Sequence, residues 1–245
     1  MVFQFYAMYP DKNVFEQMAF PLRMRKSPKA IVRQPQVYLL DEPLTNPDAK
    51  LRAHMRAELK RIQNELKTTT IYVTHDQLEA MILASRIAIM DKDKIVQYDT
   101  PDRLYERPSD LFVAGFVGAP PMNFVDCTLT SDNDEYRLDA GDFKYDVSDM
   151  PELIRKSSVG GELILGIRPE NLSIAERATD RDAIEAQVDI IELLGSQMIV
   201  NLKVGSHYFK ADTREIPLQP NERVEIIFDR SKIHIFDKKT GTAIV

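Results

Sequence analysis

Glycine is missing from the first 114 residues, because all nine glycines of the 245-residue chain lie at or beyond Gly115. Loops that wrap a phosphate in successive backbone N–H groups need glycine, since glycine reaches the required backbone conformations at little steric cost. The pattern G-x-x-x-x-G-K-[ST], which is typical of such loops, occurs nowhere in the sequence. These 245 residues therefore exclude a glycine-rich phosphate loop of that kind.

Cysteine and long apolar runs are also scarce. The single cysteine, Cys127, cannot form an internal disulfide, and no Cys/His cluster has metal-ligand spacing. We expect Cys127 to be a small core residue. No apolar run approaches the ~18 residues of a membrane span, and MVFQFYAMYP lacks the basic start and cleavage site of a signal peptide. These features predict a protein of the cytoplasm.

Positive charge is scarce in the second half of the chain. Residues 119–245 carry 15 Lys and Arg against 23 Asp and Glu, whereas residues 1–118 carry 17 against 15. An acidic half argues against a nucleic-acid surface, so we expect no nucleic-acid partner. One short basic cluster comprises Arg23, Arg25, Lys26 and Lys29. We interpret it as a solvated segment, with a phosphate-binding patch as the alternative.

The first half has the pattern of a strand, a helix and a second strand. The apolar run Val37–Leu40 predicts a strand buried on both faces. Asn46 and Pro47 are suited to start a helix, as N-cap and first helical residue. One face of that helix is marked by Leu51, Met55, Leu59, Ile62 and Leu66. A second strand follows at 70–74, and this βαβ spacing predicts two parallel strands.

Two further elements are expected after this unit. Asp76 and Glu79 have the spacing of a capping box, which predicts a short helix that carries Leu78, Met81 and Ile82. Residues 86–90 and 94–98 then predict a hairpin around Asp91–Asp93.

The second half alternates apolar and polar residues between turn signals. The predicted strands are 186–194, 198–204, 207–211, 223–228 and 232–236. Several short strands of this kind favour a small barrel or sandwich. Residues 118–121, Gly-Ala-Pro-Pro, are a plausible linker. We therefore predict two domains, 1–118 and 119–245.

Polar side chains follow the two strands of the βαβ unit. Asp41 and Glu42 end the first strand, and His75 ends the second. Ligands of open parallel sheets bind at the carboxyl ends of strands. There one carboxylate can hold a hydrated Mg²⁺, another can orient water, and a histidine can contact a phosphoryl group. The alternatives are carboxylates that cap the next helix and an ordinary loop histidine.

Taken together, VYLLDEPLTNPDAKLRAHMRAEL and TTTIYVTHDQLEAM resemble the ATP-binding subunits of ABC importers, most of all the sugar-uptake group of the maltose type. VYLLDEP is similar to the Walker B strand, TNPDA to the D-loop and YVTHDQLEAM to the switch-histidine segment. MVFQFYAMYPDKNVFEQMAFPL is similar to the Q-loop segment. FVAGFVGAPPMNF and LGIRPENL resemble parts of the accessory C-terminal region. The resemblance implies a partial P-loop-NTPase-like parallel α/β sheet, followed by an all-β, OB-like module.

The resemblance also implies roles for single residues. Asp41 would bind Mg²⁺ through water, and Glu42 would be the general base for the attacking water. His75 would contact the γ-phosphate of ATP. Gln4 would sense Mg²⁺ and water, and Asp48 would help form a contact across a dimer. ATP and Mg²⁺ are thus the implied cofactors.

The implied partners are the membrane permease subunits of the importer and a second copy of the chain. The location implied is the cytoplasmic face of the membrane. The permease would contact roughly residues 5–22, where Phe5, Tyr6 and Tyr9 either serve that contact or belong to the core.

The sequence departs from the family in three places. Besides the glycine-rich loop, it lacks the LSGGQ signature, and RMRKSP passes directly into KAIVRQPQ, so we expect a deletion near Ser27–Lys29. Pro47 stands where the family usually has leucine. We therefore expect weak or absent ATP binding by this chain alone. One alternative is a non-catalytic β-module for dimerisation or regulation, and another is a helicase-type ATPase.

Overall fold

The computed structural model describes residues 36–245 except 45–48, 134, 176–181, 196 and 215. Contacts within the chain divide it into two units. The first reaches Ala88 and includes Tyr98–Pro101, and the second comprises Ile89–Gln97 and Asp102–Val245. The domain boundary between residues 118 and 119 stays a prediction.

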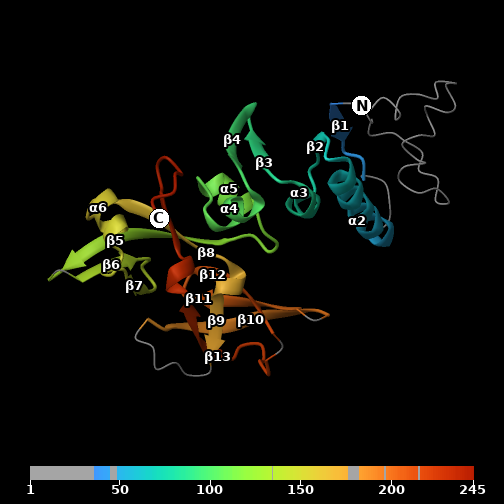
Figure 1. The fold of residues 1–245 in the computed structure, drawn as a ribbon. Coiled ribbons are helices and arrows are strands. Elements are labelled where there is room, and N and C mark those ends of the chain that lie inside the picture. Colours follow the sequence, from blue (N-terminus) through green and yellow to red (C-terminus); the bar gives the residue numbers. More distant parts are fainter. Residues whose placement is uncertain (1–35, 45–48, 134, 176–181, 196, 215) are drawn as a thin grey trace, which may run out of the picture. The chain divides into compact units, whose positions relative to one another are not determined.

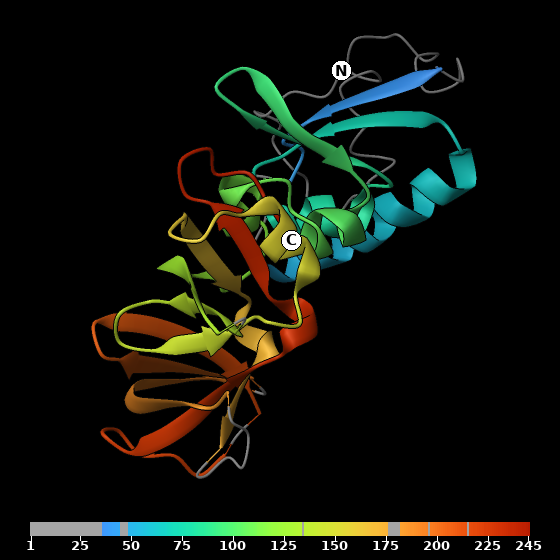
Figure 2. The ribbon, with the colours of Figure 1, turned by 90° about the vertical axis from the view of Figure 1, so that its left-hand side faces the viewer.

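The first unit contains the predicted βαβ arrangement. Strand β1 (Val37–Asp41), helix α2 (Ala49–Leu66) and strand β2 (Thr69–Val73) follow one another. The two strands pair in parallel, with Leu39 opposite Ile71. Figures 1 and 2 show α2 along one face of this small sheet. The parallel pairing is therefore confirmed, whereas the predicted helix start at Asn46 and Pro47 lies outside the described residues.

The core of this unit lies between α2 and the loop after β1. Leu44 and Met55 are buried there, and three partly buried residues pack against them: Leu51, Leu59 and Ile62. This confirms the predicted apolar face of the helix, except for Leu66, whose side chain is not described. The amphipathic pattern predicted the buried face correctly, because an 18-residue helix repeats its apolar face several times.

The expectation that β1 is buried on both faces is wrong for the part of the chain that the structure describes. Val37 and Leu39 are each 45% exposed, whereas Leu40 is buried. On β2, Ile71 and Val73 are also more than half exposed. Side chains of a strand alternate between faces, and only the face toward α2 is covered.

Helix α3 (Gln77–Leu83) begins at an N-cap as predicted, since the Asp76 carboxylate accepts the Glu79 N–H at 3.1 Å. The other half of the predicted capping box is wrong. The Asp76 N–H donates to Thr74 Oγ1 at 3.0 Å, while the Glu79 carboxylate accepts two hydroxyls. Glu79 faces inward because those hydroxyls satisfy its carboxylate there.

The buried face of α3 also differs from the expectation. Leu78 and Ile82 are 55% and 43% exposed, and the buried residues are Glu79 and Leu83. By apolarity alone the Leu78 and Ile82 face would be buried, because the face with Leu83 also carries the charged Glu79. Packing against β2 and α2 selects the face that carries Glu79.

Strands β3 (Ile87–Asp91) and β4 (Lys94–Asp99) form a two-stranded sheet of their own, as predicted. Lys92 and Asp93 at the turn have φ of 45° and 63°. Two short helices follow, α4 (Pro101–Glu106) and α5 (Leu111–Phe116). Neither helix is predicted by the sequence pattern, because six residues are too few to show a helical period.

The rest of the second unit is a β-module of two five-stranded sheets (Figure 1). One sheet has the order β14-β8-β5-β6-β7, with β5 (Asn123–Asp132), β6 (Glu135–Asp139), β7 (Lys144–Asp146), β8 (Glu162–Ile167) and β14 (His234–Asp237). The other has the order β12-β11-β10-β13-β9, with β9 (Leu172–Ala175), β10 (Ile184–Leu194), β11 (Gln197–Val204), β12 (His207–Thr213) and β13 (Arg223–Phe228). The remaining elements are α6 (Pro151–Lys156) and the 3-10 turns Pro169–Asn171 and Arg230–Lys232. The predicted all-β module is confirmed.

The two sheets share one hydrophobic core. Tyr145 of one sheet and Phe228 of the other meet there, with ring centroids 5.5 Å apart, and the Phe209 ring lies 5.6 Å from Phe228 within its own sheet. Cys127 lies in the same core, as predicted. The strand predicted at 232–236 begins only at His234, because Asp229 caps the 3-10 turn before it.

Candidate functional site

Glu42 and His75 meet at the carboxyl ends of β1 and β2. The Glu42 N–H donates to the Val73 carbonyl at 2.8 Å, which extends the parallel pairing by one residue beyond β1. His75 lies two residues beyond Val73, and its Nδ1 is 3.1 Å from Glu42 Oε1. The predicted convergence of these two side chains is confirmed, while their catalytic roles stay predictions.

The pair combines a constrained backbone with an exposed ring. Glu42 has φ of 43°, in the left-handed region that residues with a Cβ seldom adopt. Its side chain is 22% exposed, and that of His75 is 73% exposed. Strained backbone of this kind is found preferentially at functional sites. The His75 imidazole is therefore accessible to a ligand from solvent, while the Glu42 carboxylate that contacts it is more buried.

The other predicted site residues are placed only in part. Asp41 is the last residue of β1, opposite Val73, and is partly buried. It therefore lies at the same sheet edge as Glu42. Gln4 and Asp48 lie outside the described residues, so their predicted roles remain predictions.

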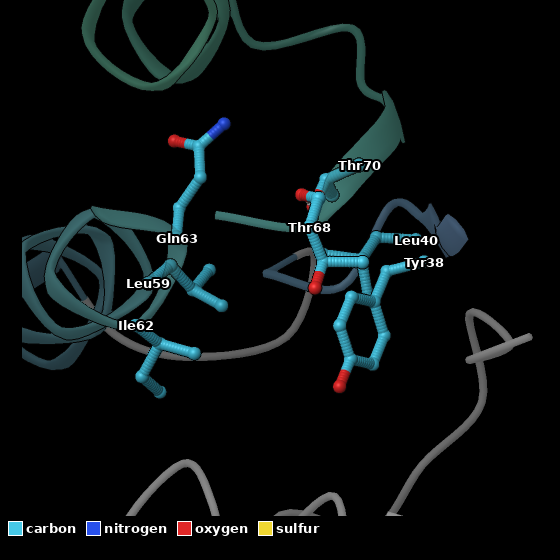
Figure 3. A pocket seen from close by; sticks show the side chains of 7 residues that line it. All are labelled: Tyr38, Leu40, Leu59, Ile62, Gln63, Thr68 and Thr70. Carbon is cyan, nitrogen blue, oxygen red and sulfur yellow. Dashed lines mark hydrogen bonds between the residues drawn. The ribbon is translucent and has the colours of Figure 1, made fainter. Parts of the chain in front are cut away.

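The described residues hold no cluster of three metal ligands, and the crevice between α2 and its sheet is small. Among them, no three His, Cys, Asp or Glu side chains come close enough to hold a metal ion. A crevice between the sheet and α2 has a volume of about 40 Å³, with Tyr38, Leu40 and Thr70 pointing from the strands toward Leu59, Ile62 and Gln63 (Figure 3). That volume suits about one water molecule, whereas ligand sites measure roughly 300–1,000 Å³.

A hydrogen-bonded network flanks His75 that sequence analysis did not find. Glu79 is only 3% exposed, and its Oε2 accepts the hydroxyls of Tyr72 at 2.8 Å and Thr74 at 2.9 Å. Burial and the Glu79 carboxylate raise the pKa of the Tyr72 phenol, so Tyr72 stays a donor. The sequence did contain a signal for this network. Tyr72 and Thr74, two positions apart at the end of β2, place their hydroxyls on the same side, and the acidic Glu79 follows on the next helix.

A second missed residue is Arg168, within the string LGIRPENL. Its side chain is 2% exposed and donates to the carbonyls of Tyr105 at 2.7 Å and Val117 at 2.6 Å. Burial lowers the pKa of this guanidinium. Arg168 thus joins α4 to Val117, the C-cap of α5, and the predicted linker at 118–121 begins next to this buried contact.

The accessory region matches two family models. Residues 118–172 match the MalK OB fold domain, and residues 165–236 match the TOBE domain. The two matches together span both sheets of the β-module.

Named relatives cover the whole chain. The trehalose/maltose import ATP-binding protein MalK of Thermococcus litoralis is 42% identical over 290 aligned residues, which include 100% of this chain and 77% of the relative. The chain belongs to the ATP-binding proteins of sugar-import ABC transporters. Two more members are the xylose/arabinose import protein XacK of Haloferax volcanii and the oligosaccharides import protein MsmX of Bacillus subtilis. Each is 36% identical and matches 100% of this chain, with 74% of XacK and 78% of MsmX covered.

Membership of the sugar-import ABC family accounts for the strings that the sequence shares with it. It places LGIRPENL in the accessory OB and TOBE region, where Arg168 makes its buried contacts. This membership decides against the alternative interpretation of the chain as a helicase-type ATPase. No helix in the described part of the chain is long and apolar enough to cross a membrane.

Proposed function

We propose that the chain is, by descent, the ATP-binding subunit of a carbohydrate ABC importer, whose family function is to couple ATP hydrolysis to solute uptake. The observation that supports this most is the 42% identity over the whole chain to a trehalose/maltose import ATP-binding protein. The other relatives are named for xylose and arabinose or for oligosaccharides. The proposed solute is therefore a carbohydrate, and no single sugar among those named for the relatives is proposed.

The partners proposed are the permease subunits of that importer, which would hold the chain at the cytoplasmic face of the membrane. In a complete site of this family Glu42 would act as the general base and His75 would contact the transferring phosphoryl group. Their 3.1 Å contact at the strand ends supports a shared role.

The 245 residues on their own are proposed to bind ATP weakly or not at all. Positioning of the nucleotide carries most of phosphoryl-transfer catalysis, and the sequence contains neither glycine-rich phosphate-binding motif. The alignment with the Thermococcus relative supports an internal deletion. It is 290 positions long and this chain has 245 residues, so at least 45 aligned positions have no residue here.

An ATP hydrolysis assay tests the proposed inactivity. It compares the chain with Glu42→Gln and with Glu65→Gln, a control that removes an exposed carboxylate of α2 paired with Arg61. All three are expected to show no hydrolysis above background. Hydrolysis by the chain and by Glu65→Gln, but not by Glu42→Gln, would show an active site in these residues and refute the proposal.

A second candidate function is dimerisation through the β-module. Three apolar residues of β10 are more than half exposed: Ile190, Leu193 and Leu194. Sedimentation over a range of concentrations is expected to show a dimer that Leu193→Asp weakens, with Val159→Asp, an exposed apolar residue outside β10, as the control. A chain that stays monomeric at the highest concentration would remove this candidate.

A further inference from the structure

Glu79 is linked to both neighbours of His75. Thr74, on the N-terminal side, donates its hydroxyl to Glu79 Oε2 at 2.9 Å. Asp76, on the C-terminal side, accepts the Glu79 N–H at 3.1 Å. The Asp76 N–H donates to Thr74 Oγ1 at 3.0 Å and so closes a ring of bonds around the peptide that carries His75.

His75 cannot be held in place by packing of its own side chain, which is 73% exposed. Its position relative to Glu42 therefore depends on the backbone between β2 and α3. Glu79 is the buried acceptor in that segment, at 3% exposure, and it lies on a helix rather than in the loop. A buried carboxylate with two hydroxyl donors is a rigid anchor, because each partner would be left unsatisfied if it moved.

We propose that Glu79 is a positioning residue, which acts through Thr74 to hold the His75 imidazole against Glu42. The inference rests on the proposed function, since it assigns the ring of bonds to the site formed by Glu42 and His75. It adds to that function a residue that bonds to both chain neighbours of His75.

Two single substitutions separate positioning from general structural support. Tyr72→Phe and Thr74→Val each remove one hydroxyl donor from the same Glu79 oxygen. Only Thr74 adjoins His75 and accepts the Asp76 N–H. If the Glu79 carboxylate only supports the fold, the two substitutions should affect the His75–Glu42 contact similarly. If Glu79 positions His75, only Thr74→Val should break that contact.

The test is nuclear magnetic resonance on the 245-residue chain without nucleotide. One readout is the nuclear Overhauser effect between the His75 ring and the Glu42 side chain. The other is hydrogen exchange of the Asp76 amide. Thr74→Val is expected to abolish the ring contact and to speed Asp76 exchange about tenfold, the factor for losing one hydrogen bond. Tyr72→Phe and the control Glu65→Gln are expected to leave both readouts unchanged.

Glu79→Gln and Glu79→Leu complete the series. Gln keeps an acceptor oxygen and is expected to retain the ring contact, whereas Leu has none and is expected to lose it. If Glu79→Leu fails to fold, Thr74→Val still decides. An intact ring contact in Thr74→Val, or an equal loss in Tyr72→Phe, would overturn the proposal. Because these readouts need no ATP, a failed ATP hydrolysis assay leaves them interpretable.

Discussion

The guanidinium of Arg168 lies over the ring of Tyr105, with its Cζ 3.7 Å from the ring centroid, and donates two hydrogen bonds to the Tyr105 carbonyl. The Tyr105 hydroxyl in turn donates to Glu170, two residues beyond Arg168. A residue of α4 is thus fixed on both its backbone and its side chain by the RPEN segment.

Replacing Arg168 by Lys should destabilise the second unit. Lysine cannot reproduce the planar fork that reaches the Tyr105 and Val117 carbonyls, nor the stacking on the ring. We expect the free energy of unfolding to fall by about 2–4 kcal/mol. Urea denaturation followed by circular dichroism measures it. The matched control is Arg137→Lys, at an exposed arginine paired with Glu135, and an equal shift in both variants would refute the structural role of Arg168.

Gly118 should tolerate alanine poorly. Its φ is +121°, and a Cβ there would lie 2.8 Å from Arg168 Nη1. Gly141 also has positive φ, +85°, but a Cβ there would meet nothing within 4 Å. Gly141→Ala thus measures backbone strain alone, about 1 kcal/mol. Gly118→Ala is expected to lower the thermal midpoint clearly further, and equal midpoints would show that Arg168 moves aside freely.

The stability of the second unit should depend on pH through His234. Burial, and then the charge of Arg168, lower the pKa of His234 to about 4, while Glu106 opposes and Lys232 supports the shift. The unfolded chain takes up this proton near the ordinary pKa of about 6.5. The unfolding free energy is therefore unaffected above that pH and falls as the pH drops toward 4, by about 3 kcal/mol in all.

The change His234→Gln removes this titration. Between pH 6.5 and 4 the variant should lose less stability than the parent chain, although carboxylates titrate in both. Denaturation midpoints at a series of pH values provide the comparison. Identical slopes for the two proteins would mean that His234 takes up its proton equally well in the folded state.

Cys127 should be chemically inert until the fold opens. It is 6% exposed in the shared core, and burial raises the pKa of its thiol to about 12. Since the thiolate is the reactive form, an aromatic disulfide reagent at about pH 8 should react at least 100-fold more slowly than in denaturant. Because the chain has one cysteine, the thiol signal reports this site alone. Rapid reaction under native conditions would show that the core opens readily.

Elements whose pattern repeats, and positions that topology fixes, could be predicted from the sequence. The 18 residues of α2 display their apolar face over several turns, and the strand pattern predicted β13 to the residue. The meeting of Glu42 and His75 followed from the parallel pairing alone, because the carboxyl ends of parallel strands share one edge.

The rest depended on contacts that local sequence does not specify. Arg168 and Tyr105 are 63 positions apart, and nothing near either residue indicates the other. Glu79 was expected to close a capping box, but hydroxyls from the preceding strand compete for its carboxylate. Leu78 and Ile82 have the spacing of a buried helix face, yet both side chains are exposed because another face of α3 packs against the rest of the unit.

The central claim is that these 245 residues keep the Glu42–His75 end of the family's site without the means to hold a nucleotide. A direct Mg-ATP binding titration on the purified chain tests it, with Asp41→Ala as the control at the same sheet edge. The account predicts no saturable binding up to about millimolar ATP for either protein, that is, a binding free energy weaker than about −4 kcal/mol. Tight binding that Asp41→Ala abolishes would contradict it, because another loop would then hold the phosphates.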